Sequence, residues 1–439
     1  MASLRFSLRL TLAYLARFKG IIFFGVILGI VFFFLIRIVS LTLLKGTTER
    51  IGVMGRHHTD DLPEKILDLV SDGLTKTGEE GIIEPDLAAS WETPDKGKTW
   101  IFHLKKGRFW QDGSPITSQS LIYEFSDVSV EKPDESTIIF KLKDPYSPFP
   151  AAVSKPSFRK GLLGVGEWKV DKILVAGSFV ESITLVNSDK DKKIFKFYPT
   201  VERTKLAYKL GEVDSVQDLL HPQPFDSWKN TNQATSSDKS QVIVLFFNTM
   251  DPLLSEKALR QALTYAIDKD LFGERAISPI SPNSWAFNPQ VKEYPYDPKR
   301  ARELIAEMED EAKKNLEIKL VSSAHLLPTA EKISKNWEEI GVKTLVQVSS
   351  IIPGEFQAYL TILDIPKDPD QYPLWHSTQD ATNISKYTNP RIDKLLEDGR
   401  VELNIEERKK IYLDFQRFLL EDLPAAFLYH PTYFTISRK

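Results

Sequence analysis

Residues Val242–Phe247 read VIVLFF, an unbroken run of apolar side chains. A run of this length without polar alternation is typical of a β-strand that is buried on both faces. From Ser255, which is placed to cap a first turn, the apolar spacing becomes that of a helix, with Leu259, Leu263 and Ile267 on one side. A doubly buried strand followed by an amphipathic helix predicts a central sheet covered by helices.

Strands and helices continue to alternate towards the end of the chain. An alternating strand at 316–321 precedes a helix that presents Ile333 and Trp337 on one face, and a second strand follows at 342–348. A strand, a helix and a strand of these lengths form a crossover between parallel strands. The tail at 425–437 is aromatic and extended. We therefore predict an α/β fold.

An apolar run from Gly20 to Ile36 precedes this globular part, and residues 1–19 carry four cations and no acid. The more positive flank of a membrane segment usually stays in the cytoplasm. We therefore predict that 1–46 form a cytoplasmic stub and a single-pass membrane anchor, with everything that follows outside the cytoplasm. A cleaved signal peptide is the alternative, but its apolar core is usually about 7 to 15 residues long.

The composition narrows the class of protein. The absence of cysteine excludes disulfides, thiolate catalysis and lipid attachment through cysteine. Residues 1–45 carry six positive charges and no negative ones, so the total of −3 leaves −3 − 6 = −9 for the remainder. A mildly acidic exported part is poorly suited to nucleic acid, which is bound by neutralising its phosphates. With 42% of hydrophobic residues in the whole chain, the exported part can build two or three lobes by packing alone.

The sequence lacks the motifs of an enzyme or a metal site. Its seven histidines are scattered, with no pair spaced as in a metalloprotease helix. No serine lies in a nucleophile elbow, and Gly164 and Gly166 lack the third glycine of a dinucleotide-binding loop. We therefore predict no catalytic residues, no metal and no cofactor.

One segment, 363–377, places acids beside aromatic residues. A calcium loop is disfavoured because Pro366 and Pro369 interrupt the acids. Acids beside aromatic rings favour a pocket for a cationic, partly apolar ligand, although surface turns share this composition. Trp285, in a proline-rich loop, is either a pocket wall or a lid over the core. The candidates of the segment are Asp364, Asp368, Asp370, Tyr372, Trp375 and His376.

Blocks of sequence distributed along the chain carry a resemblance to a known family. They are PDLAASW (85–91), KGRFWQDGSP (106–115), GVGEWKV (164–170), LGEVD (210–214), LRQALTYAID (259–268), YTNPRIDKLL (387–396) and DLPAAFLY (422–429). In this order they resemble the extracellular solute-binding proteins of peptide ABC importers, the oligopeptide- and dipeptide-binding family five. The chain departs from that pattern in three places. It lacks a lipid-bearing cysteine, and its stretch at 123–131 is shorter than in the family. The segment at 56–61 lacks the usual leucine-aspartate-proline start, so ligand contacts from the first strand are not transferred to this chain.

The resemblance implies a two-lobed, periplasmic-binding-protein-like fold of type II, whose lobes close around a ligand by hinge motion. Lobe one is expected at 47–250, with a shortened small subdomain at about 85–150, and lobe two at 251–424. Residues 425–439 are expected to return to lobe one as a tail. The implied function is a monomeric receptor that captures a peptide and delivers it to an ABC permease.

The resemblance also implies contacts to the ligand. In similar proteins one aspartate holds the ammonium of the peptide, and Asp364 takes that place because it stands ahead of the Asp368 and Pro369 pair, one residue out of the usual spacing. Asp368 and Asp370 are the alternative aspartates for this role. Tyr372, Trp375 and His376 are expected to form pocket walls from lobe two. Asn248 and Trp285 are expected near the hinge and the mouth of the pocket.

Three alternatives stay open. The same fold on an uncleaved helix is also suited to a sensory or scaffolding ectodomain, although a stub of about nineteen residues is short for a signalling domain. The solute is a peptide or another small molecule such as a sugar or a nickel chelate. A hydrolase is disfavoured because no nucleophile, base or metal arrangement is found.

Overall fold

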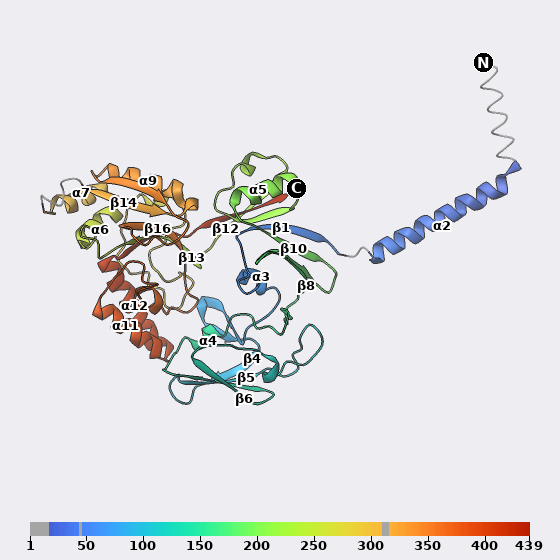
Figure 1. The fold of residues 1–439 in the computed structure, drawn as a ribbon, viewed down its shortest axis with the longest axis horizontal. Helices are drawn as coiled ribbons and strands as arrows, with labels where there is room; N and C mark the ends of the chain where they lie inside the picture. The colour runs from blue at the N-terminus through green and yellow to red at the C-terminus, as the bar shows by residue number, and fades with distance from the viewer. Residues whose placement is uncertain (1–16, 44–45, 310–315) are drawn as a thin grey trace, which may run out of the picture.

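The computed structural model describes residues 17–43, 46–309 and 316–439. It shows two lobes, a small subdomain below lobe one and a helix, α2 (Lys19–Leu43), that projects away from both lobes (Figure 1). Within the described ranges, no helix reaches the combination of length and apolar character that crossing a membrane requires.

Lobe two is built on a five-stranded sheet in the order β15-β14-β16-β13-β17. The parallel pair β14 and β15 is joined through α9 (Leu327–Glu338), which is the predicted crossover. The strands are β13 (Gln241–Phe247), β14 (Glu317–Ser322), β15 (Lys343–Val348), β16 (Ala358–Asp364) and β17 (Ala425–Tyr429).

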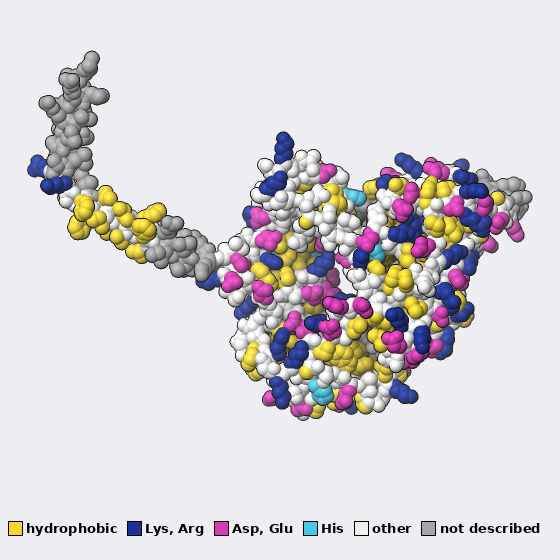
Figure 2. Space-filling view, turned by 180° about the vertical axis from the view of Figure 1, so that it is seen from behind, with side chains coloured by type: hydrophobic (Ala, Val, Ile, Leu, Met, Phe, Trp, Pro, Cys, Tyr) yellow, Lys and Arg dark blue, Asp and Glu magenta, His cyan; other side chains and the backbone are white. Residues whose placement is uncertain are grey.

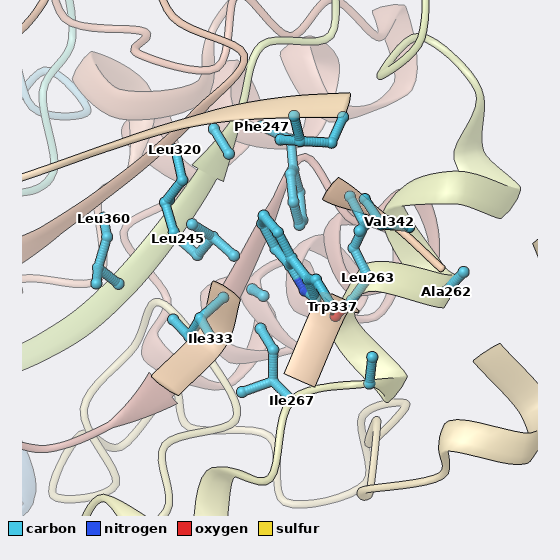
Figure 3. Packing of buried hydrophobic residues seen from close by; sticks show 14 of the residues in the cluster. Leu245, Phe247, Ala262, Leu263, Ile267, Leu320, Ile333, Trp337, Val342 and Leu360 are labelled. Carbon is cyan, nitrogen blue, oxygen red and sulfur yellow. Dashed lines mark hydrogen bonds between the residues drawn. The ribbon is translucent and has the colours of Figure 1, made fainter. Parts of the chain in front are cut away.

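The central strand β13 is buried on both faces, as predicted. Ile243, Leu245 and Phe247 point into a core with α6, α7 and α9, whereas the alternate residues Val242 and Phe246 point into a second core with α11 and α12. Figure 3 shows the first core around Trp337. The sheet is therefore the middle of three layers, with α6 (Lys257–Tyr265), α7 (Pro298–Ala306), α11 (Pro390–Val401) and α12 (Ile405–Asp422) on its faces.

One predicted helix start is wrong. Helix α6 begins at Lys257 with Glu256 at its N-cap, and no side chain caps its first turn. The hydroxyl of Ser255 instead donates a hydrogen bond to the carbonyl oxygen of Pro252 at 3.0 Å. Ser255 is therefore part of the turn before the helix.

Lobe one is built on a seven-stranded sheet in the order β12-β18-β11-β1-β10-β9-β8. Helix α5 (Val201–Leu210) packs on one face and the short α3 (Glu64–Leu67) on the other. The strands are β1 (Thr48–Met54), β8 (Lys169–Ala176), β9 (Phe179–Val186), β10 (Lys192–Tyr198), β11 (Ser215–Leu219), β12 (Thr231–Ser237) and β18 (Thr432–Arg438).

The small subdomain is a four-stranded antiparallel sheet with its own aromatic core, including Trp100, Phe102 and Phe140. The sheet has the order β4-β5-β7-β6, and a two-stranded ribbon and the short α4 complete this part of the chain. The elements are β2 (Thr75–Thr77), β3 (Ile83–Pro85), β4 (Ala88–Glu92), β5 (Thr99–Leu104), β6 (Val128–Asp134), β7 (Thr137–Leu142) and α4 (Phe149–Ala152).

Two short connections join the sheets of the two lobes. One is 238–240, between β12 and β13, and the other is 430–431, between β17 and β18. The sheets thus divide the chain about ten residues before the expected boundary at 250, and only β18 of the expected tail lies in lobe one. The reason is that β13 needs partners on both edges, and β16 and β17 supply them.

Candidate functional site

A pocket of about 820 Å³ lies where the two lobes meet. Lobe one contributes, through its small subdomain, the loop 77–81, which connects β2 and β3 and contains the 3₁₀ turn η1 (Glu79–Gly81). The connection between the lobes contributes Ser240, and lobe two contributes residues of the loop 281–289, the segment 365–367 and Lys409. Because its lining comes from both lobes and from the connection, a movement of one lobe against the other would open or close this interlobe pocket.

Two contacts join the lobes at this pocket. The backbone N–H of Trp285 donates a hydrogen bond of 2.6 Å to the backbone carbonyl of Glu80. Glu80 has a φ of +56°, a left-handed conformation that is uncommon for a residue other than glycine. The ammonium of Lys367 lies 2.5 Å from a carboxylate oxygen of Glu64 in α3. The described arrangement is thus one in which the lobes touch over the pocket.

Asp364 lies beside the interlobe pocket, at the end of β16. Its side chain is exposed and accepts a hydrogen bond of 2.6 Å from the amide nitrogen of Gln241, the residue opposite it on β13. The next residue, Ile365, lines the pocket and donates its backbone N–H to the carbonyl of Ser240 at 2.7 Å. Asp364 therefore stands at the connection between the lobes with no cation paired to it among the described residues.

Asp368 and Asp370 form ion pairs within lobe two, and Asp370 also accepts a hydrogen bond of 3.4 Å from the hydroxyl of Tyr146 in the small subdomain. Asp368 forms a two-pronged ion pair with Arg408 of α12, with contacts of 2.6 and 2.8 Å and side chains only 12% and 7% exposed. Asp370, 6% exposed, accepts a bond of 3.1 Å from Arg400 of α11. Burial raises the pKa of Asp370, and the charge of Arg400 opposes that rise. Both carboxylates hold helices of lobe two to this segment.

The aromatic residues of the same segment divide between the core and a second cavity. They lie in or just after α10 (Tyr372–Trp375). Trp375 is fully buried between Phe246 and Phe427. His376 is also buried, and Tyr372 stacks on its ring with centroids 4.0 Å apart.

The second cavity, of about 550 Å³, lies between the small subdomain and lobe two. Tyr372 and Arg400 line it from lobe two, and Tyr146 lines it from the small subdomain. The backbone N–H of Ser147 donates to the carbonyl of Arg400 at 2.7 Å, which ties the two walls together. Burial raises the pKa of Tyr146 to about 12, and the nearby Asp370 adds to that rise.

Asn248 and Trp285 differ in their access to the interlobe pocket. Asn248 ends β13 with a turn, in which its amide nitrogen donates to the carbonyl of Phe356 at 3.0 Å and its side-chain oxygen accepts from Met250. Trp285 lines the pocket, and Arg408 lies 5.6 Å from the centre of its ring. Of the residues expected from the sequence, Trp285 lines the interlobe pocket and Asp364 adjoins it.

Sequence reasoning did not find several charged residues of the pocket: Glu79, Glu80, Lys367 and Lys409. They lie in ordinary polar stretches, so residue type alone does not single them out. One neighbouring signal was readable: Arg408 falls on the apolar side of the helix predicted after Asn404, and a cation on a buried face requires a counter-charge. Over the described residues, no group of three or more potential metal ligands is found.

Comparisons with known proteins agree with this architecture. The family model described as bacterial extracellular solute-binding proteins, family 5 Middle, matches residues 83–383. The chain is 24% identical to the oligopeptide-binding protein AppA of Bacillus subtilis (strain 168), over 85% of this chain and 83% of that protein. It is also 24% identical to the dipeptide-binding protein of Escherichia coli (strain K12), over 81% of this chain and 82% of that protein.

Solved structures share the fold. AppA from Bacillus subtilis in complex with a nonapeptide superimposes with a TM-score of 0.69 at 21% identity, covering 90% of this chain and 95% of that one. NikZ from Campylobacter jejuni in complex with Ni(L-His) gives a TM-score of 0.72 at 24% identity, covering 89% of this chain and 94% of that one. These likenesses confirm the predicted two-lobed α/β fold.

Proposed function

Because the chain belongs to family 5 of the bacterial extracellular solute-binding proteins, we propose that it captures a peptide outside the cytoplasm and delivers it to the permease of an ABC importer. Two of the similar proteins named above are an oligopeptide-binding and a dipeptide-binding protein. In this role the protein acts as a monomer and releases its solute with every covalent bond intact.

The observation that carries this proposal is the interlobe pocket. Its volume of about 820 Å³ falls in the range typical of small-molecule sites, about 300 to 1,000 Å³. Its walls come from two lobes joined by two short connections, so binding energy can be used to close the lobes around a solute. The permease would then recognise the closed arrangement.

We assign the ammonium group of the peptide to Asp364. Its carboxylate is exposed beside the pocket and is bonded to a neutral amide, so a cationic group can approach it. Trp285 is the proposed apolar wall. Tyr372, Trp375, His376 and Asn248 contribute through the packing of the second lobe, and Asp368 and Asp370 through its ion pairs.

We further propose that the apolar N-terminal segment anchors the protein in the cell membrane, with its first residues in the cytoplasm. The support is the apolar run Gly20 to Ile36, the cations before it, and the exposed apolar side chains along α2, which Figure 2 shows extending away from the lobes. Carbonate extraction of membranes tests this: an anchored chain stays in the pellet, and a peripheral one is released.

The test of the function is calorimetric titration of the full-length chain, purified in detergent, with peptides of two to nine residues. We expect saturable binding of at least one peptide with micromolar or tighter affinity, and peptides among the compounds that mass spectrometry finds bound to the purified protein. Binding of nickel-histidine or of a sugar in place of every peptide would overturn the peptide assignment.

Two further measurements separate the remaining alternatives. Co-purification with permease subunits supports transport, whereas co-purification with a histidine kinase would indicate a sensory ectodomain. Prolonged incubation with the same peptides should leave their masses unchanged, and the appearance of cleavage products would contradict a purely binding role.

A further inference from the structure

The two walls of the interlobe pocket carry unpaired charges of opposite sign. Glu79 and Glu80 line it from lobe one, and Lys409 lines it from lobe two. None of these three side chains has an ion-pair partner within 4.0 Å among the described residues. The acids and the lysine therefore face the same cavity without neutralising each other.

Lys409 differs from the two cations beside it in α12. Arg408 is buried and held by Asp368 at 2.6 Å, and Lys410, 68% exposed, is held by Glu407 at 2.7 Å. Successive residues of a helix are about 100° apart, so these three cations face different surroundings. Of the three, only Lys409, which is half-buried at the edge of the cavity, has no acidic partner among the described residues, so its charge is available to a bound solute.

Resting on the proposed function and deepening it, we propose that Lys409 binds an anionic group of the solute, in the first place the terminal carboxylate of a peptide. An ammonium in a half-enclosed cavity gains more from a carboxylate than it does in open water, since the surrounding solvent screens the pair less. Trp285 and Phe287 supply the apolar surface next to it.

Glu79 and Glu80 give the opposite wall the opposite preference. A second anionic group on the solute would be repelled there, whereas a cationic or neutral group would not. The pocket thus selects solutes whose charges are separated, with the negative end on lobe two. A solute held by Asp364 and Lys409 on lobe two favours closure when its cationic or neutral part meets Glu79 and Glu80, because that contact with lobe one is available only when both lobes are in place.

The test is calorimetric titration of the full-length chain in detergent with trialanine and with trialanine amide. In the native protein we expect amidation to weaken binding by about tenfold. In Lys409→Met, trialanine should bind as weakly as its amide, so that amidation no longer matters. The matched control is Lys410→Met, which should keep the native tenfold difference. Equal melting temperatures verify that the variants are folded.

Two more peptides identify the anionic group and test the opposite wall. In the native protein, Ala-Glu-Ala amide should bind more tightly than trialanine amide only if Lys409 also accepts a side-chain carboxylate. Ala-Glu-Ala with a free terminus should bind the native protein more weakly than trialanine, and Glu79→Gln with Glu80→Gln should remove that difference.

The outcomes separate this proposal from the function on which it rests. If peptides bind but Lys409→Met keeps the native amidation effect, the role of Lys409 is overturned and peptide capture stands. If the native protein binds trialanine and its amide equally, the carboxylate assignment falls in the same way. If no peptide binds in either form, both the proposed peptide function and the role of Lys409 are wrong.

Discussion

Asp364 and Asp368 lie four residues apart in the chain and in opposite environments. Asp364 is exposed at the end of β16, beside the interlobe pocket, and its only described side-chain partner is an amide. Asp368 is 12% exposed and is clamped by both terminal nitrogens of Arg408. The comparison teaches that the carboxylate at the connection is left without an ion pair among the described residues, while the one just beyond it holds the lobe together.

The turn between them produces this difference. β16 ends at Asp364, and Pro366 and Pro369 lie in the segment that takes the chain from the end of this central strand to the helical face of lobe two. There α12 presents Arg408 and α11 presents Arg400, each to one acid. Helices that are distant in sequence thus determine which acids are neutralised.

The largest expected effect is on Asp368. Asp368→Ala leaves the buried guanidinium of Arg408 without its counter-charge, so we expect the free energy of unfolding to fall by about 3–5 kcal/mol. Urea denaturation measures it. The double variant Asp368→Ala with Arg408→Met should recover most of the loss, because no charge is then buried alone. A double variant as unstable as the single one would mean that packing, and not charge, is responsible.

The next effect is on Asp364 and appears in binding. Asp364→Ala should weaken peptide binding at least about tenfold, because a charge-assisted contact to the ammonium is lost. Its free energy of unfolding should change by no more than about 0.5 kcal/mol, as for other exposed substitutions. Calorimetry and urea denaturation measure the two quantities. Asp380→Ala, an exposed aspartate away from the pocket, is the control, and an equal affinity in both variants would remove Asp364 from the site.

A smaller effect concerns the pH dependence that Asp370 imposes. Burial raises the pKa of Asp370 above the ordinary value of 3.8, so the folded protein keeps this proton to a higher pH than the unfolded chain does. Over the window from 3.8 up to the raised pKa, the contribution of this group to stability therefore falls as pH rises. Urea denaturation at a series of pH values should show this decline in the native protein relative to Asp370→Asn. Parallel curves would contradict it.

The smallest effect is on the contact across the lobes. Lys367 and Glu64 are 45% and 43% exposed, so Lys367→Met should reduce peptide affinity by no more than about fivefold, equivalent to about 1 kcal/mol. The control is Lys394→Met, which breaks an exposed pair with Asp398 inside α11. A titration in high salt should lessen the effect of Lys367→Met. A larger loss than that of Asp364→Ala would reverse the order of the comparison.

Local signals predicted much of the fold because they act between neighbours in the chain. The predicted parallel crossover and the doubly buried strand at 242–247 are confirmed, since apolar spacing encodes burial directly. The predicted helix cap at Ser255 was wrong because its hydroxyl donates to the carbonyl of Pro252 in the preceding turn. The site was harder to predict: Trp375 and His376 have the composition of a pocket wall, but they are buried beneath the surface.

The sequence by itself determined the α/β architecture, the family and the absence of cysteine chemistry, because each depends only on residue types and their order along the chain. Only the tertiary structure decided which charges are paired. Asp368, Asp370, Arg400 and Arg408 neutralise one another across helices and a turn, whereas Asp364, Glu79, Glu80 and Lys409 are left near the interlobe pocket without an ion pair among the described residues. Coulomb attraction depends on distance and on exclusion of water, and neither is set until the lobes pack.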